Sequence, residues 1–351
     1  MKALLILTIA LQVHAESRKG AWDPKAAAAY LDARAAWWMD WKPAARDHDT
    51  FCVSCHTALP YVVARPALRG YLAEQKPTAV EQRMLDNVIK RVRLGSEAKP
   101  LYAKEHADES KGSEAVMNAF LLVSHDAQSG TFGSDAKLAL DQMLALQEKS
   151  GENAGSIVWM DFHYQPWEAS DARYWGATLA AGTLGMAPAE YRSGPGAKLL
   201  AGYLQQHADG QPLFNQLGLL WASTKMSGLL KPAQRDAILG EISSRQANDG
   251  GWSASTLLRP DWKRRDATPL ETKSDGYATA LIAYVLREVG QPADKNESLA
   301  KASHWLRTNQ DAESGSWPAW SMNKQRDPAS DAGKFMSDAA TAYAVLALQE
   351  K

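Results

Sequence analysis

The chain alternates between two kinds of helical segment along most of its length. One kind has apolar residues at helical spacing and charged residues on the opposite face, the pattern of a half-exposed helix. The other kind is apolar on all sides and rich in Ala and Gly, which predicts a buried helix with closely packed neighbours. The half-exposed helices are predicted at 24–41, 77–94, 134–149, 196–208, 232–245 and 297–308.

The buried segments share an opening phrase, in which Ser and an acidic residue precede small and apolar residues. Ser followed by an acid is typical of a helix N-cap, and the acid also suits the helix dipole. Asn215 and the segment 54–56 open comparable helices. The phrase occurs at Ser113-Glu114, Ser170-Asp171, Ser274-Asp275 and Ser337-Asp338.

The two kinds of segment therefore pair into six helical hairpins, each with one buried and one half-exposed helix. A single hairpin cannot bury its own apolar face, whereas stacked hairpins bury a continuous core. The predicted fold is all-α, an α/α toroid of about six hairpins. The competing architecture is an open solenoid, which needs polar capping units at its ends. The first and last units are no more polar than the others, and this favours closure.

The N-terminus predicts a cleaved secretory signal peptide at 1–15. Lys2 gives a positive start, the segment 3–13 is mostly apolar, and Val13-His14-Ala15 is similar to a cleavage site. We expect export to a periplasm or to the outside of the cell. The predicted organisation continues with N-terminal helices at 16–110, forming the first part of the toroid, and toroid repeats at 111–351.

Composition narrows the class of protein. The abundance of Ala, Leu, Gln, Glu and Lys favours helix, and the thirteen Trp residues are typical of repeated architectures. A formal net charge of −1 gives no indication of the excess positive charge that is typical of proteins that bind nucleic acid. No later stretch is long and apolar enough for a membrane span.

Cys52-Val53-Ser54-Cys55-His56 is a C-x-x-C-H, the attachment signature of a c-type haem. Two thiols at this spacing each add to one vinyl group of a porphyrin, and the adjacent imidazole binds the iron. These are the only cysteines in the chain. The sequence therefore predicts one covalent haem c, held by Cys52 and Cys55 with His56 as the proximal iron ligand. The alternatives are a local disulfide and a redox dithiol.

The opposite face of such a haem needs a distal ligand or an open position. On the geometry of a closed ring, the distal candidates are Met336, Met322, His106 and His163. Each has an ordinary alternative, because Met often fills cores and an isolated loop His is often only solvated.

The starts of the buried helices should converge on one mouth of the ring. Long connections precede them at 99–112, 157–169, 253–273 and 318–336, and long loops on one face often carry function. The predicted candidates for this mouth are Glu114, Trp167, Glu168, Asp171, Asp275 and Asp338. The alternative for each acid is a helix-dipole or capping role, and Trp167 shares with the other repeat Trp residues the alternative of core packing.

Four of the half-exposed helices end in a Gln that is followed by a Gly, and two of these continue to a Trp. They are Gln147…Gly151, Gln206…Gly210, Gln246…Gly250-Gly-Trp252 and Gln310…Gly315-Ser-Trp317. These segments resemble the QW repeats of the squalene cyclase and prenyltransferase superfamily, and the resemblance implies an α/α toroid from about Glu114 onward. The N-terminal part, with WWMDW and FCVSCHTALPY, is similar to bacterial exported proteins that join a haem motif to cyclase-like repeats.

The chain departs from the enzymes of that superfamily at their catalytic motifs. No D-x-D-D-T-A acid motif is present, and both Cys belong to the C-x-x-C-H, so no zinc set remains. The first hypothesis is therefore an exported monohaem c-type cytochrome that transfers electrons to a redox partner. The second is a haem-dependent oxidoreductase with a substrate in the toroid. The third is a haem-free toroid that acts on or binds a terpenoid or a glycan, with acids and Trp suiting a glycan and an apolar lining suiting a polyprenoid.

Overall fold

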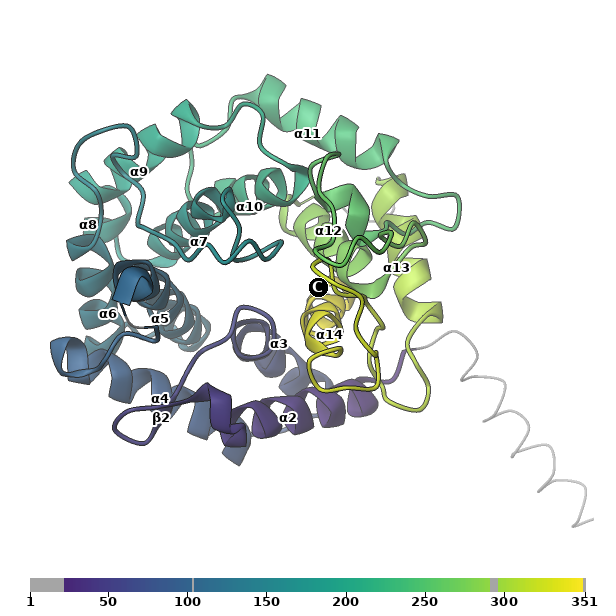
Figure 1. The fold of residues 1–351 in the computed structure, drawn as a ribbon, viewed down its shortest axis with the longest axis horizontal. Coiled ribbons are helices and arrows are strands. Elements are labelled where there is room, and N and C mark those ends of the chain that lie inside the picture. Colours follow the sequence, from purple (N-terminus) through teal and green to yellow (C-terminus); the bar gives the residue numbers. More distant parts are fainter. Residues whose placement is uncertain (1–21, 103, 291–295, 350–351) are drawn as a thin grey trace, which may run out of the picture.

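The computed structural model describes residues 22–102, 104–290 and 296–349, and the predicted signal peptide lies outside this range. Helices dominate it and form two concentric rings (Figure 1). The outer helices are α2 (Pro24–Asp40), α4 (Ala79–Leu94), α6 (Ser134–Ala145), α9 (Pro195–Gln206), α11 (Pro232–Ser244) and α13 (Glu297–Thr308). The inner helices are α3 (Ala58–Tyr71), α5 (Ala107–Ser129), α7 (Ala172–Met186), α10 (Leu213–Ser223), α12 (Gly276–Glu288) and α14 (Phe335–Leu348). The predicted α/α toroid of six hairpins is confirmed.

Smaller elements connect these helices. The hairpin of β1 (Ala45–Arg46) and β2 (Thr50–Phe51) is antiparallel and pairs Ala45 with Phe51. It lies between α2 and α3 and leads into the C-x-x-C-H motif. The remaining short elements are α8 (Ala189–Arg192) and the 3-10 turns η1 (Lys42–Ala44), η2 (Gly95–Glu97), η3 (Lys104–His106) and η4 (Ala254–Leu257). None of the helices in the described ranges is both long and apolar enough to cross a membrane.

Small residues on the inner helices let large side chains approach their backbones. A Cβ at Gly176 of α7 would lie 2.2 Å from the ring of Trp159. A Cβ at Gly182, two turns later, would lie 2.1 Å from the ring of Trp221. The Gly-rich and Ala-rich composition of α7 is therefore a packing requirement, as the pattern of its sequence indicated.

A recurring glutamine joins neighbouring outer helices. The Nε2 atom of Gln147 donates to the backbone oxygen of Gly196 at 2.8 Å, and that of Gln246 donates to the oxygen of Ser298 at 2.9 Å. Gln310 repeats this bond across the ends of the chain, donating to the oxygen of Asp23 at 3.0 Å. The Asp23 backbone N–H donates back to Gln310 Oε1 at 2.6 Å. The last outer helix is thus joined to the first, and α14 also packs against α2 and α3.

Replacing Gln310 should therefore weaken the closure of the ring. We expect Gln310→Ala to lower the free energy of unfolding by about 1–2 kcal/mol, because it removes a reciprocal pair of hydrogen bonds. Chemical denaturation measures this change. Gln75→Ala is the matched control, since Gln75 is exposed and bonds only to the oxygen of Ala73 nearby. Equal stabilities of the two variants would contradict a role for Gln310 in closure.

The predicted Ser-acid caps are wrong at two helices. The inner helices α5 and α14 begin earlier than predicted, so that Ser113 and Ser337 lie inside them. Their hydroxyls instead hold the long connections, accepting from the N–H groups of Met160 at 2.9 Å and Ala319 at 3.0 Å. Asp275 does cap α12, accepting from the N–H groups of Tyr277 and Ala278.

The starts of α3 and α7 differ in whether a side chain caps the helix. Ser54 Oγ accepts from the N–H groups of Thr57 and Ala58 at the start of α3. Asp171 occupies the N-cap position of α7, and its side chain makes no capping bond there. The acid at the helix start therefore caps α12 but does not cap α7.

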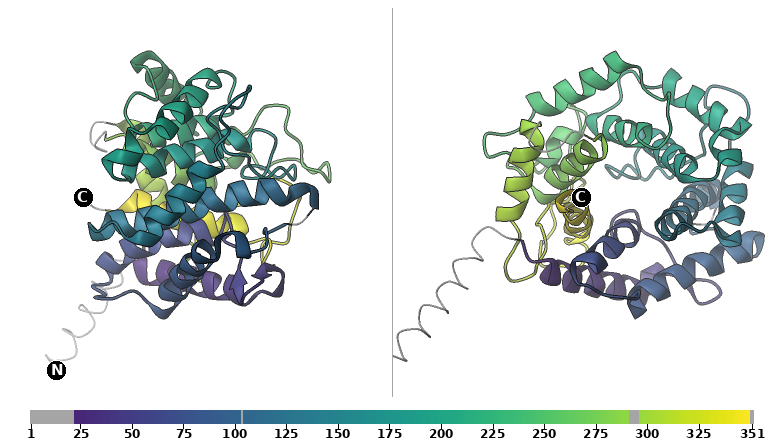
Figure 2. Two further views of the ribbon diagram at one scale, coloured as in Figure 1. Left: turned by 90° about the vertical axis from the view of Figure 1, so that its left-hand side faces the viewer. Right: turned by 180° about the vertical axis from the view of Figure 1, so that it is seen from behind.

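The long connections gather at the end of the ring where the inner helices begin, which we call the loop mouth (Figure 2). The first of them is shorter than predicted, because η3 and the first turn of α5 occupy its second half. Gln165 and Asn323 tie two of these loops together, with bonds of 2.8 Å in both directions. Trp262, from a third loop, donates to the oxygen of Met322 at 3.0 Å. Hydrogen bonds thus join the loops of the loop mouth into one layer over the starts of the inner helices.

Candidate functional site

The C-x-x-C-H motif lies at the loop mouth, where β2 passes into α3. The buried amide of Asn87 on α4 bonds both the N–H and the oxygen of Phe51 and so fixes the strand. Trp38 Nε1 donates to the oxygen of Cys52 at 2.7 Å. Both cysteines are free and buried, and the Cys55 sulfur lies 3.6 Å from the Met117 sulfur.

Burial keeps both thiols protonated. It raises the pKa of Cys52 to about 12, and it raises the pKa of Cys55 well above its usual value. A nearby Glu168 carboxylate adds to both shifts. Reactive cysteines have a lowered pKa and some exposure, and neither thiol has these properties here.

His56 is oriented by a buried chain of hydrogen bonds. Its Nδ1 atom lies 2.8 Å from Thr57 Oγ1, and Thr57 Oγ1 lies 2.6 Å from Asp338 Oδ2. Arg34 Nε and the Tyr30 hydroxyl both donate to the other carboxylate oxygen at 2.8 Å. Because the single proton of Thr57 goes to the carboxylate, Nδ1 of His56 must be the donor to Thr57. The lone pair of the imidazole therefore lies on Nε2.

The charged groups in this chain of hydrogen bonds neutralise one another within the protein. Burial is the largest influence on Asp338 and raises its pKa, whereas its bonds to Arg34, Thr57 and Tyr30 oppose the shift. The Arg34 guanidinium is the counter-charge that holds the buried carboxylate. Burial lowers the pKa of His56 to about 3, and the charges of Arg34 and Arg326 act in the same direction. The imidazole is neutral throughout the physiological range.

Aromatic rings enclose the imidazole. The ring of Phe335 stacks on His56 with centroids 3.8 Å apart, and Trp38 meets it edge-on at 5.0 Å. Trp167 lies at 6.2 Å. Together with Met117 against Cys55, these side chains occupy the space beside the sulfurs and the imidazole. Covalent attachment of haem c at Cys52 and Cys55 stays a prediction from the motif.

The four residues predicted as distal ligands lie in ordinary environments. Met336 and Met322 are buried in the core. His106 Nδ1 lies 2.8 Å from Glu109 Oε2, and its ring packs against Phe162. His163 is mostly exposed and lies beside Asp161.

Glu168 is the predicted mouth residue with the most unusual carboxyl group. Burial raises its pKa to about 7. Its backbone is held in a tight turn, since its oxygen accepts from the N–H groups of Phe162 and Tyr164. Among the described residues we find no hydrogen bond or ion pair to its carboxyl. The carboxyl of Glu168 is therefore partly protonated at neutral pH.

The carboxylates of the other acids predicted at the mouth already have partners within the protein. Glu114 forms an ion pair with the buried Arg91. Asp171 pairs with Arg259 at 3.1 Å. Asp275 caps α12 and also accepts from the N–H of Ala254. The structure thus brings His56, Trp167 and Glu168 together with the cysteines, joins Asp338 to them through Thr57, and leaves the other acids as structural groups.

Tyr277 is a mouth residue that the sequence pattern did not single out. It follows the Ser274-Asp275-Gly276 phrase directly, which is the one signal that marks it. Its ring meets Trp167 edge-on at 5.5 Å, and its fully buried hydroxyl has no hydrogen-bond partner within the described ranges. A buried hydroxyl without a partner is costly, so it is a group that a ligand could satisfy.

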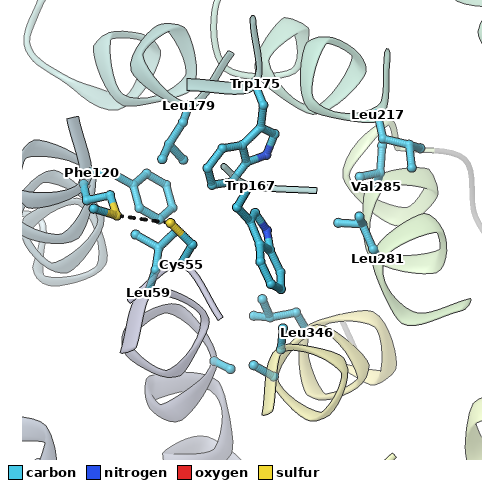
Figure 3. Close-up of a cluster of buried hydrophobic side chains, with 14 of the residues drawn as sticks. Cys55, Leu59, Phe120, Trp167, Trp175, Leu179, Leu217, Leu281, Val285 and Leu346 are labelled. Carbon is cyan, nitrogen blue, oxygen red and sulfur yellow. Dashed lines mark hydrogen bonds between the residues drawn. The ribbon is translucent and has the colours of Figure 1, made fainter. Parts of the chain in front are cut away.

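Within the ring lies a narrow cavity of about 60 Å³, which we call the ring cavity. All six inner helices line it with apolar side chains, and Figure 3 shows this cluster beside Cys55 and Trp167. Two of its few polar groups are hydrogen-bonded: the Thr178 hydroxyl donates to the oxygen of Trp175, and Tyr284 accepts from Trp221. Representative lining residues are Leu59, Phe120, Leu179, Leu217, Leu281 and Leu346.

Comparison with known proteins identifies the fold class. No family model and no curated protein matches the chain. Among solved structures, a glycosidase is similar with 15% identity and a TM-score of 0.53, covering 96% of this chain and 99% of its own. An inactive variant of α-1,6-mannanase from Salegentibacter sp., in complex with α-1,6-mannotetrose, has 10% identity, a TM-score of 0.56 and coverages of 93% and 99%. An unsaturated glucuronyl hydrolase from Streptococcus agalactiae has 10% identity, a TM-score of 0.56 and coverages of 94% and 93%. At these identities the likeness shows that the protein has the α/α toroid fold.

The prediction of an electron-transferring cytochrome is wrong. The chain follows glycosidase structures over nearly its whole length. Nor do the described residues contain a group of three or more His, Cys, Asp or Glu side chains that could hold a metal ion. That prediction rested on the five residues of the C-x-x-C-H motif, whereas the toroid accounts for most of the chain. The findings support the third hypothesis, a haem-free toroid that acts on or binds a terpenoid or a glycan, better than the first.

Proposed function

We propose that this protein binds an apolar molecule of the polyprenoid class in the ring cavity. The observation that carries the proposal is the lining, in which apolar and aromatic side chains from all six inner helices face one enclosed space. Its volume is about 60 Å³, so a ligand of this class enters only as the lining side chains move apart. Burying an apolar ligand there gains roughly 25 cal/mol per Å² of apolar surface removed from water.

The same lining disfavours a sugar inside the ring. Each buried hydroxyl of a sugar needs a hydrogen-bond partner, and an unpaired one costs roughly 1–3 kcal/mol in proteins. The Thr178 hydroxyl and the Trp221 indole N–H already have partners. A polyprenoid has no such requirement along its chain, and a single polar end could reach the Tyr277 hydroxyl at the loop mouth.

A second candidate function is action on a glycan at the loop mouth. Trp167 and the raised pKa of Glu168, about 7, favour it, since a protonated carboxyl is the general acid that glycoside cleavage needs. Most such enzymes also need a second carboxyl group across the scissile bond. Asp171 is the acid nearest in sequence to Glu168, and it is paired with Arg259. This candidate therefore ranks second.

Farnesol and squalene are the probes that test the first proposal. Quenching of tryptophan fluorescence should report binding, because Trp175 and Trp221 line the ring cavity. We expect Leu281→Gln and Leu281→Trp to weaken binding at least tenfold, the first by adding a polar group and the second by filling the space. A tenfold loss corresponds to about 1.4 kcal/mol.

Leu138→Gln is the matched control, because Leu138 lies exposed on α6 and outside the ring cavity. Thermal melts should show that all three variants fold. Tight binding of α-1,6-mannotetrose without binding of either probe would overturn the proposal in favour of the glycan candidate. Unchanged affinity in both Leu281 variants would also contradict it.

A further inference from the structure

A second pocket lies outside the inner ring, where the outer helices α4 and α6 meet the inner helix α5. Its volume is about 350 Å³, and it shares no lining residue with the ring cavity. The chain between α4 and η3 forms one wall, after Gly95 ends α4 with a positive φ of 52°. The lining combines charged, amide and apolar groups, among them Arg91, Lys99, Lys111, Asn118, Gln142 and Leu146.

The amide of Asn118 is the unsatisfied group of this pocket. The residue is 5% exposed, and its Oδ1 atom has no hydrogen-bond partner among the described residues. Buried polar side chains nearly always have partners, and a missing one costs roughly 1–3 kcal/mol. An Asn that lines a pocket without a protein partner is therefore placed to meet a ligand.

The free charge around the pocket is positive. Arg91 is fully used by the protein, bonding Glu114, Thr50 and the oxygen of Lys99. Glu114 is neutralised by the same contact. Lys99 forms no ion pair within the described ranges, and Lys111 only approaches the exposed Asp108 at 4.0 Å. Two ammonium groups are thus available to an anion.

Part of the pocket lining is apolar. Leu146 is 41% exposed, which is unusual for a large apolar side chain in this protein. Ala115 and Ala145 also belong to the lining. A ligand that fits these groups carries a negative charge for the lysines, a hydroxyl for Asn118, and a carbon face for Leu146.

We propose that this pocket, the α4–α6 pocket, binds a monosaccharide-sized anion, either a sugar acid or a sugar phosphate. A sugar ring supplies both the hydroxyl donors and the carbon face, and its carboxylate or phosphate meets Lys99 and Lys111. The site is independent of the ring cavity, so its occupancy does not require the polyprenoid proposal to hold.

Three probes with the same ring test the charge requirement by calorimetry on the whole protein. D-Glucuronate and glucose 6-phosphate carry the anion, and D-glucose lacks it. We expect either or both anions to bind at least fivefold more tightly than glucose, and a preference between them identifies carboxylate or phosphate as the source. Asn118→Leu and the double variant Lys99→Gln/Lys111→Gln should each weaken the preferred anion at least fivefold.

Lys137→Gln is the matched control, because Lys137 lies exposed on α6 outside the pocket. The lysine variants are at the surface and should melt as the native protein does, so they test the site even if Asn118→Leu is unstable. Equal binding of glucose, no binding of any probe, or unchanged affinity in the double lysine variant would each overturn the proposal.

Discussion

Arg34→Met should lower the free energy of unfolding by about 3–5 kcal/mol, a larger effect than any other substitution considered above. The side chains of Arg34 and Asp338 are 7% and 1% exposed, and Arg34 Nε lies 2.8 Å from Asp338 Oδ1. Met keeps the length and apolar stem of Arg but removes the charge. Asp338 is then left buried without a counter-charge, and this is the costly event. Urea unfolding followed by circular dichroism measures it.

An exposed ion pair supplies the control for this experiment. Arg83 pairs with Asp40, and their side chains are 50% and 67% exposed, so Arg83→Met should cost under about 1 kcal/mol. Adding Asp338→Asn to Arg34→Met should recover part of the loss, because the stranded charge is removed. A loss below about 1 kcal/mol in Arg34→Met, or no recovery in the double variant, would show that Asp338 does not depend on Arg34.

This network also explains how the first and last hairpins are held in one ring. Arg34 and Tyr30 come from α2, Asp338 comes from α14, and Thr57 precedes α3. The same carboxylate therefore connects three helices and, through Thr57, sets the tautomer of His56. Loss of Arg34 should loosen the closure of the ring and the orientation of the imidazole together.

The arrangement of hairpins could be predicted because helical periodicity is a local property. The outer helices differ from their predicted ranges by only a few residues, and Glu297–Thr308 is the same in both. The start of α5 could not be predicted in this way. A Ser followed by an acid has the same sequence whether it caps a helix or, as at Ser113, holds the backbone of Met160 from another hairpin.

The site was only partly predictable, for the same reason. The motif marked Cys52, Cys55 and His56, and the repeat placed Asp338 at the same mouth. Thr57, which connects His56 to Asp338, has no distinctive pattern, and Arg34 lies 304 residues from its partner. The contents of the ring cavity depend on side chains from six helices at once, and sequence spacing does not give their relative heights.

Glu168→Gln should change how stability depends on pH. Burial raises the pKa of Glu168 from 4.5 to about 7, so between these values the folded state binds a proton that the unfolded state has lost. Stability from this group is fully present below about pH 4.5 and is lost as pH rises through 7. Gln is neutral at every pH, so the variant should gain stability relative to the native protein as pH rises, by up to about 3 kcal/mol at pH 8.

Unfolding by urea at pH 5, 6, 7 and 8 measures this difference, with Glu190→Gln as the control because Glu190 is exposed on the short helix α8. Parallel pH profiles for Glu168→Gln and the native protein would contradict a buried, unpaired carboxyl. The result also bears on function. A carboxyl that destabilises the fold at neutral pH has no structural reason to remain ionisable, because Gln fills the same space without that cost. If the predicted gain is found, the acidity of Glu168 must be explained by what it does at the loop mouth, and loss of glycan cleavage in the same variant would then favour the second candidate function.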